Sequence, residues 1–428
     1  MLRHRPALLT AALLLATAAC ADSPTAVDPV ASASRAGGGG SEGRGVFHRY
    51  VAIGTSVSMG VQSDGVNLET QQTSWPAQLA RLASRELSQP LIAYPGCPAP
   101  LAHTLSTGVR LSGESAALPF LARACAPNVP GVTLPAGNVA IDGARTIHAL
   151  TATPENPDPG HALQYQRVLA PGMTQLSAME AQNPKIVSVE LGANDILGAR
   201  SGVFIPGVSV VPVSVWAGQY AQVVDRVVAA SKHAVLVGLL DDISSFPSFR
   251  TGNELWDARA TFAPFNVAVA ADCQNSANIM FVAVRVPVAV ATGAAMANAG
   301  AGPYTLSCAN APSSSGVVDY VLGPDEVPAV NAQLAAMNAI IEGHAETHGL
   351  AYFELGALYE DAYVKAPFSA VTLLTSTQPF GPLISLDGVH PSALGARVLA
   401  DAAATAINEQ YGLGIPTAGN VIAMLARR

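Results

Sequence analysis

Short apolar runs alternate with longer segments of helical periodicity along most of the chain. Apolar runs of strand length cover residues 50–53, 138–141, 185–191, 233–240 and 350–354. Apolar residues recur at helical spacing over residues 75–87, 169–182, 216–231, 327–348 and 392–411, with Pro391 at the first turn of the last segment. Strands that alternate with helices predict an α/β fold, in which helices cover both faces of a parallel sheet.

Two segments between these elements, 89–137 and 242–326, are far longer than the roughly two to six residues usual for strand–helix connections. Both are rich in apolar residues and poor in charge. At least the first begins and ends near strand ends, so we expect the two insertions to wall the ligand crevice. Such a wall would offer apolar surface to a substrate.

The first residues of the chain have the pattern of an export signal. Arg3 and Arg5 precede an apolar run over 7–16, which is too short to span a bilayer that needs roughly 20 residues. Residues 17–20, Thr-Ala-Ala-Cys, resemble a bacterial lipobox, which implies a signal peptide over 1–19 and a lipid anchor on Cys20. The alternative is cleavage after Ala18, which leaves Cys20 as an unpaired thiol.

Residues 20–45 have the Gly, Ser, Pro and Ala composition of a flexible linker, and residues 46–428 are predicted to form one folded domain. Half of the chain is hydrophobic, so disorder throughout is excluded. With 30 acidic and 22 basic residues, the net charge is −8, which excludes nucleic-acid binding through a basic surface. We expect no obligate protein partner.

The other four cysteines form two couples that are local in sequence. Three pairings are possible, and the local one joins Cys97 to Cys125 and Cys273 to Cys308. Metal binding is disfavoured because the chain has no C-x-x-C spacing and no second ligand beside His103. We expect disulfides at these positions, and neither a metal nor another cofactor.

Four short polar motifs follow predicted strands or precede the last helix. They are Gly-Thr-Ser-Val-Ser at 54–58, Asp-Gly-Ala at 142–144, Gly-Ala-Asn-Asp at 192–195 and Asp-Gly-Val-His-Pro at 387–391. Each alone has a structural explanation as a turn or a helix cap. In a parallel sheet, however, the carboxyl ends of the strands form the ligand crevice. The four motifs in this order are therefore a more specific indication of a functional site than any one of them alone.

These motifs resemble those of the SGNH, or GDSL-type, hydrolases. The resemblance implies a flavodoxin-like three-layer α/β/α sandwich around a five-stranded parallel sheet. It also implies Ser56 as the nucleophile, His390 as its base and Asp387 as the acid that orients the base. Ser56, Gly143 and Asn194 match the oxyanion-hole donors. Thr55 departs from the family pattern, which has Asp at that position.

The residue chemistry agrees with this resemblance, because a serine hydroxyl needs a base to become a nucleophile and imidazole is suited to that task. We therefore predict an exported esterase or lipase that acts on a small-molecule or lipid ester. A carbohydrate O-deacetylase of the same family and a non-catalytic surface-binding lipoprotein are the alternatives.

Other polar side chains are interpreted as structural. His344 and His348 lie at a predicted helix end, and Asp241 and Asp242 follow a strand. Glu190, two residues before the Gly-Ala-Asn-Asp motif, and Asp195, the last residue of that motif, are also interpreted as structural carboxylates.

Overall fold

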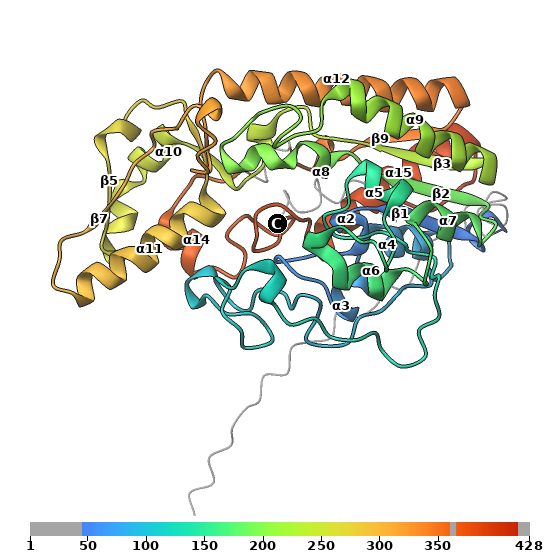
Figure 1. Cartoon of the computed structure of the whole chain (residues 1–428), viewed down its shortest axis with the longest axis horizontal. Helices are drawn as coiled ribbons and strands as arrows, with labels where there is room; N and C mark the ends of the chain where they lie inside the picture. The colour runs from blue at the N-terminus through green and yellow to red at the C-terminus, as the bar shows by residue number, and fades with distance from the viewer. Residues whose placement is uncertain (1–44, 360–364, 418–428) are drawn as a thin grey trace, which may run out of the picture. The chain divides into compact units, whose positions relative to one another are not determined.

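The computed structural model describes residues 45–359 and 365–417 (Figure 1). The predicted signal peptide, Cys20 and all of the predicted linker except Gly45 lie outside the described residues. Among the described helices, none is long and apolar enough to cross a membrane.

The central sheet has four parallel strands in the order β1-β2-β3-β9. The strands are β1 (Tyr50–Gly54), β2 (Ile186–Glu190), β3 (His233–Gly238) and β9 (Ala351–Glu354). All residues of β1 and β2 are buried. This is the pattern of a sheet covered on both faces, in which strands are continuous apolar runs. Four of the five predicted strands are therefore confirmed.

The fifth predicted strand, 138–141, lies beside β1 without forming a regular ladder. Ala52 donates to the Gly137 carbonyl at 2.8 Å, and Val139 donates back to the Ala52 carbonyl at 2.9 Å. The N–H of Ile141 also donates to the Gly54 carbonyl at 3.1 Å. The Gly54 N–H, which a regular ladder would direct to the Val139 carbonyl, instead donates to the side chain of Gln175 at 3.1 Å, so the ladder is interrupted. The sheet thus has four strands and an irregular edge segment where the family resemblance implied a fifth strand.

Helices cover both faces of the sheet and complete the α/β/α arrangement (Figure 1). On one face, α12 (Glu326–His348) packs on β3 and on α9 (Val213–Ala230), which contacts α7 (Gln175–Glu180) and α5 (Thr146–Thr151). On the other, α15 (Ala393–Tyr411) packs on β9 and on α4 (Trp75–Leu82). The shorter α-helices are α2 (Ser56–Met59), α3 (Leu68–Gln72), α6 (Ala162–Val168), α8 (Ala193–Ile196), α13 (Gly356–Tyr359) and α14 (Ala370–Thr375).

Several helix boundaries differ from the prediction, and three of them have a local explanation. The chain leaves α4 at Leu82, and Ser84 then has a positive φ of 56°. The side chain of Thr174 caps α7 and sets its start at Gln175. The hydroxyl of Ser392 accepts the N–H groups of Leu394 and Gly395 and so caps α15. Pro391 therefore lies before the cap, and the prediction that it occupies the first helical turn is wrong.

The second insertion, 242–326, folds around its own small sheets. Strands β4 (Phe249–Thr251), β6 (Ile279–Phe281) and β8 (Val321–Leu322) form one, and β5 (Val267–Val269) and β7 (Tyr304–Leu306) form the other. Helices α10 (Gly252–Asp257) and α11 (Val282–Asn298) pack with them. The predicted disulfide between Cys273 and Cys308 is present here, and the Cys97–Cys125 disulfide closes a loop of the first insertion.

Candidate active site

The four polar motifs converge at the carboxyl edge of the central sheet. Ser56 is the first residue of α2, directly after β1, and Asn194 lies in α8, just after β2. Gly143 follows the edge segment beside β1, and His390 precedes α15. The structure therefore brings together residues that are more than 300 positions apart in the sequence.

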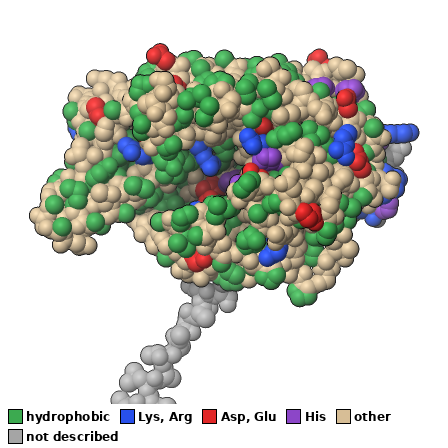
Figure 2. Space-filling view, in the orientation of Figure 1, with side chains coloured by type: hydrophobic (Ala, Val, Ile, Leu, Met, Phe, Trp, Pro, Cys, Tyr) green, Lys and Arg blue, Asp and Glu red, His purple; other side chains and the backbone are tan. Residues whose placement is uncertain are grey.

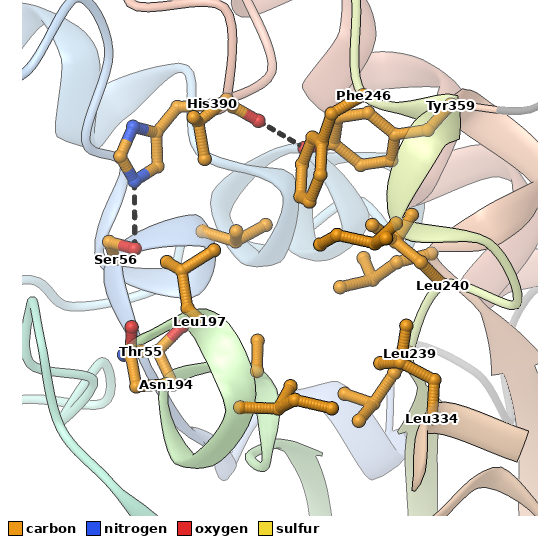
Figure 3. Close-up of a pocket in the computed structure, with 16 residues that line it drawn as sticks. Thr55, Ser56, Asn194, Leu197, Leu239, Leu240, Phe246, Leu334, Tyr359 and His390 are labelled. Atoms are coloured by element: carbon orange, nitrogen blue, oxygen red, sulfur yellow. Dashed lines mark hydrogen bonds between the residues drawn. The ribbon is translucent and has the colours of Figure 1, made fainter. Parts of the chain in front are cut away.

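Ser56, His390 and Asp387 form a continuous chain of hydrogen bonds. The Ser56 Oγ lies 2.9 Å from His390 Nε2 (Figure 3), and His390 Nδ1 lies 2.8 Å from Asp387 Oδ2. The other carboxylate oxygen of Asp387 accepts the N–H groups of Val389 and His390, both at 2.8 Å. Because an ionised carboxylate only accepts hydrogen bonds, the proton sits on Nδ1 and Nε2 faces the serine hydroxyl as an acceptor.

The electrostatics of the pair suit a base that works near neutral pH. Burial alone would raise the pKa of Asp387, but the charge and hydrogen bonds of His390 and the two backbone N–H groups lower it to about 2. Burial alone would lower the pKa of His390, but the charge and hydrogen bond of Asp387 outweigh it and raise the pKa. The charges of Asp142 and Asp64 add to this rise.

The three donors expected for the oxyanion hole have free hydrogen-bonding capacity. Among the described residues, neither the Ser56 N–H nor the Gly143 N–H has a hydrogen-bond partner. The Asn194 side-chain amide donates one N–H to the Ala144 carbonyl at 3.1 Å, which leaves its second N–H available. Free donors of this kind are what an oxyanion hole requires.

Gly143 has a backbone geometry and surroundings that favour glycine. Its φ is +71°, in the left-handed region. A Cβ at this position would lie 2.0 Å from Cε1 of His161. Any side chain would therefore displace either the His161 ring or the loop that carries the Gly143 N–H.

Glu190 ties the turn that carries Ser56 to the neighbouring strand. Its buried carboxylate accepts the Thr55 hydroxyl at 2.7 Å, the Thr55 N–H at 2.9 Å and the Ser58 N–H at 3.2 Å. Burial raises the pKa of Glu190, and these hydrogen bonds oppose the rise. A carboxylate thus stands beside Thr55 although position 55 itself lacks the Asp of the family pattern. This contact has the structural character predicted for Glu190.

Asp195 holds the Gly143 segment to α8 in the same way. It accepts the Thr146 N–H at 2.9 Å and the Thr146 hydroxyl at 2.8 Å. Burial raises the pKa of Asp195 to about 6 against these hydrogen bonds. The contact fixes the spacing between the Gly143 loop and Asn194.

Asp64 supports Asp387, and the sequence did not reveal this contact. Its backbone N–H donates to Asp387 Oδ2 at 2.6 Å. Its carboxylate pairs with the buried guanidinium of Arg110 and, at 2.9 Å, with that of Arg123. Both arginines belong to the first insertion, which therefore supports Asp387. One feature of the sequence could have indicated this role: Arg110 and Arg123 are the only arginines in an insertion that is otherwise poor in charge.

An apolar pocket opens beside Ser56 and His390 (Figure 3), and the space in and in front of it, open solvent included, is about 590 Å³. Its walls come from α8, the end of β3, α12 and the segment that follows β9. The lining side chains other than the catalytic candidates are mostly aliphatic or aromatic: Val57, Ala193, Ile196, Leu197, Leu239, Leu240, Ile243, Phe246, Leu334, Leu355, Tyr359 and Val389.

The prediction that both insertions wall this pocket is wrong for the first and holds for only two residues of the second. Ile243 and Phe246, at the start of the second insertion, contribute to the lining. Other apolar residues of that insertion are buried away from the pocket, including Phe249 and Phe281, whose rings pack on each other. Apolar composition alone did not show which core those side chains join.

The remaining polar candidates have structural contacts. Asp242 caps a short turn through the Ser244 N–H, and the rings of His344 and His348 stack on each other. Within the described residues, the one group with three side chains of metal-ligand type is Asp272, Cys273 and Cys308. Its two sulfurs are joined in a disulfide, so they are not available as thiolate ligands.

A family model described as GDSL-like lipase/acylhydrolase matches residues 50–403. The chain belongs to this family. It is therefore a GDSL-family hydrolase that acts on ester bonds, with the α/β fold expected from the motifs.

No curated protein matches this GDSL-family chain in sequence. Among solved structures, it is similar to an acetylxylan esterase from Geobacillus stearothermophilus, with 12% identity over 84% of this chain and 93% of that one, and a TM-score of 0.35. It is also similar to an extracellular lipase from Streptomyces rimosus, with 15% identity over 84% of this chain and 98% of that one, and a TM-score of 0.33.

We predict that restoring the family's Asp at position 55 harms this protein. Thr55→Asp would place a second carboxylate against buried Glu190, and the two would compete for the same backbone donors. We expect the variant to lose roughly 1–3 kcal/mol of stability, measured by urea unfolding, together with most esterase activity. Thr55→Ser keeps the hydroxyl and is the matched control. Wild-type stability and activity in Thr55→Asp would contradict the role assigned to Glu190.

Proposed function

We propose that this hydrolase cleaves esters of medium-chain carboxylic acids through an acyl-enzyme on Ser56. His390 Nε2 takes the hydroxyl proton as Ser56 Oγ attacks the ester carbonyl. The resulting oxyanion accepts hydrogen bonds from the Ser56 N–H, the Gly143 N–H and the Asn194 amide. The C–O bond to the alcohol then breaks, and the imidazolium of His390 gives its proton to the departing oxygen.

The second half of the reaction repeats these steps with water. His390 removes a proton from water, which attacks the acyl-enzyme carbonyl, and the collapse of the second oxyanion returns the proton to Ser56 Oγ. Asp387 holds the imidazole in the required tautomer and stabilises its cationic form in both halves. The products are a carboxylic acid and an alcohol.

The observation that carries this proposal is the position of the triad at the mouth of the apolar pocket. The 2.9 Å contact between Ser56 and His390 lies at one end of the pocket, and Leu239 and Leu334 lie at the far end (Figure 3). Each methylene buried in such a pocket contributes about 0.8 kcal/mol. An acetyl group would leave most of this surface uncovered, so the pocket favours a longer acyl chain over the acetate of a deacetylase substrate.

Two further features support related parts of the proposal. The complete hydrogen-bonded triad argues against a non-catalytic binding protein, which needs no base aligned on a serine. The two disulfides are typical of proteins that fold in an oxidising compartment, which supports export. A lipid anchor on Cys20 remains a prediction of the sequence.

A panel of p-nitrophenyl esters from acetate to dodecanoate tests the acyl-chain assignment. We expect kcat/KM to rise by up to about fourfold per methylene and to peak between butyrate and octanoate. Leu334→Phe adds volume at the far end of the pocket, so the ratio of octanoate to butyrate activity should fall. Ser56→Ala is the control for background hydrolysis. Highest activity on acetate, with faster release of acetate from acetylated xylan, would establish the deacetylase instead.

The pH dependence of kcat/KM tests the base. His390 accepts the serine proton only when neutral, so activity should fall as pH drops through its pKa. Because Asp387 raises that pKa, we expect the midpoint of the fall above the ordinary value of about 6.5. Asp387→Asn removes the charge, so the midpoint should move to lower pH and kcat should fall by roughly 10⁴. An unchanged midpoint in Asp387→Asn would refute this coupling.

A further inference from the structure

A second Asp-x-x-His pair lies against the Gly143 loop. Asp158 and His161 have the same spacing as Asp387 and His390, and Asp158 Oδ2 lies 2.9 Å from His161 Nδ1. The ring of Phe120 packs on the His161 ring with centroids 4.7 Å apart. Gly143 leaves the space that the ring occupies on its other side. The imidazole is thus held in one orientation beside the proposed oxyanion hole.

Two polar groups at this place have unused hydrogen-bonding capacity. Among the described residues, no group hydrogen-bonds to the carboxylate of Asp142 or to His161 Nε2. The two lie 4.0 Å apart, which is too far for a direct hydrogen bond, and their side chains are 15% and 22% exposed. One hydroxyl oxygen about 2.8 Å from each would fill the gap. A hydroxyl can donate to the carboxylate and accept a hydrogen bond from Nε2 when the imidazole is protonated on both nitrogens.

The location corresponds to the alcohol half of a bound ester. The peptide N–H that follows Asp142 is the Gly143 donor, and the charge of Asp142 helps to raise the pKa of His390. The departing alcohol takes its proton from His390, so its substituents lie close to the same carboxylate. Asp142 and His161 do not line the apolar pocket, which leaves that pocket to the acyl chain.

The surroundings of this gap are charged, in contrast to the pocket. His148 and Arg145 contact each other beside Asp158, and the charge of Arg200 also acts on His161. The face shown in Figure 2 has a hollow at whose edge acidic, basic and histidine side chains gather. The two halves of the substrate therefore meet surfaces of opposite character.

We propose that Asp142 and His161 form a subsite for a hydroxyl group on the alcohol half of the ester, so that the preferred substrates are acyl esters of polyhydroxy alcohols. This inference rests on the proposed function. The carboxylate of Asp142 accepts the substrate hydroxyl, and protonated His161, oriented by Asp158, donates from Nε2 to the same oxygen. Glycerol and sugars share this chemistry, and they differ in size.

The test compares butyrate esters that differ only in the alcohol: 1-monobutyrin, 6-O-butyrylglucose and propyl butyrate. We expect wild-type kcat/KM to be at least tenfold higher for one or both hydroxylated esters than for propyl butyrate. The hydroxylated ester with the higher kcat/KM shows whether the preferred alcohol is glycerol or a sugar. Asp142→Ala should lower that preference about tenfold, mainly through KM, since a hydrogen bond to a charged group contributes roughly 1.5–3 kcal/mol.

Variants that preserve packing separate the loss of the subsite from a loss of folding. His161→Phe preserves ring packing on Phe120 and Gly143 but removes the nitrogen, so it should also lower the preference. Asp142→Asn, which keeps the shape, should have a smaller effect. Asp225→Ala, at an exposed position on α9, should change no ratio.

Equal wild-type kcat/KM for all three esters, or an unchanged ratio in both Asp142→Ala and His161→Phe, would overturn the subsite. Hydrolysis of p-nitrophenyl butyrate separates this failure from that of the proposed function. If wild type cleaves p-nitrophenyl butyrate but shows no preference among the alcohols, only the subsite is wrong. If it cleaves no butyrate ester, the proposed function itself is wrong.

Discussion

Parallel pairing of β1 with β2 is the constraint on which the site depends. The register places Gly54, the last residue of β1, opposite Glu190, the last residue of β2. The buried Glu190 carboxylate can then bind Thr55 and Ser58, and the turn that presents Ser56 is fixed to the sheet. Asn194 follows β2 by only a few residues, so the same register sets its distance from Ser56. A parallel sheet makes this possible because successive strands end at one edge.

Buried charge is concentrated around this edge in a chain that is otherwise poor in charge. Asp387 and Asp195 show that the hydrogen-bond partner decides whether a buried carboxylate has a lowered or a raised pKa. Asp387 faces an imidazole that can carry positive charge, and its pKa is lowered to about 2. Asp195 receives hydrogen bonds from a neutral threonine, and its pKa rises to about 6. The first carboxylate is thus suited to stabilise a cation, and the second to hold a loop in place.

The family motifs and the residues they contribute were readable from the sequence because they are short, local and in a fixed order. The central strands were also readable, since a buried parallel strand is a continuous apolar run. Segment 138–141 has the same apolar character, but the side chain of Gln175 takes the Gly54 N–H that a regular ladder would use. A side-chain hydrogen bond of this kind cannot be predicted from hydrophobic periodicity.

The long-range contacts around the site could not be predicted from the sequence. Arg110 and Arg123 are isolated arginines in the sequence, and only the fold brings them to Asp64 and so to the triad acid. The same applies to His161, whose place against Gly143 depends on how the loop before α6 folds back. The walls of the pocket were misassigned because apolar composition cannot distinguish a side chain that lines a cavity from one that packs in an insertion's own core.

The central claim is that Ser56 is activated by His390 to attack an electrophilic centre. Labelling with a fluorophosphonate, followed by peptide mapping of the modified residue, tests it most directly. The account predicts one covalent adduct, on Ser56, that forms in the wild-type protein and is strongly slowed in His390→Ala. An adduct on a different residue, or labelling of Ser56 at the wild-type rate in His390→Ala, would contradict it.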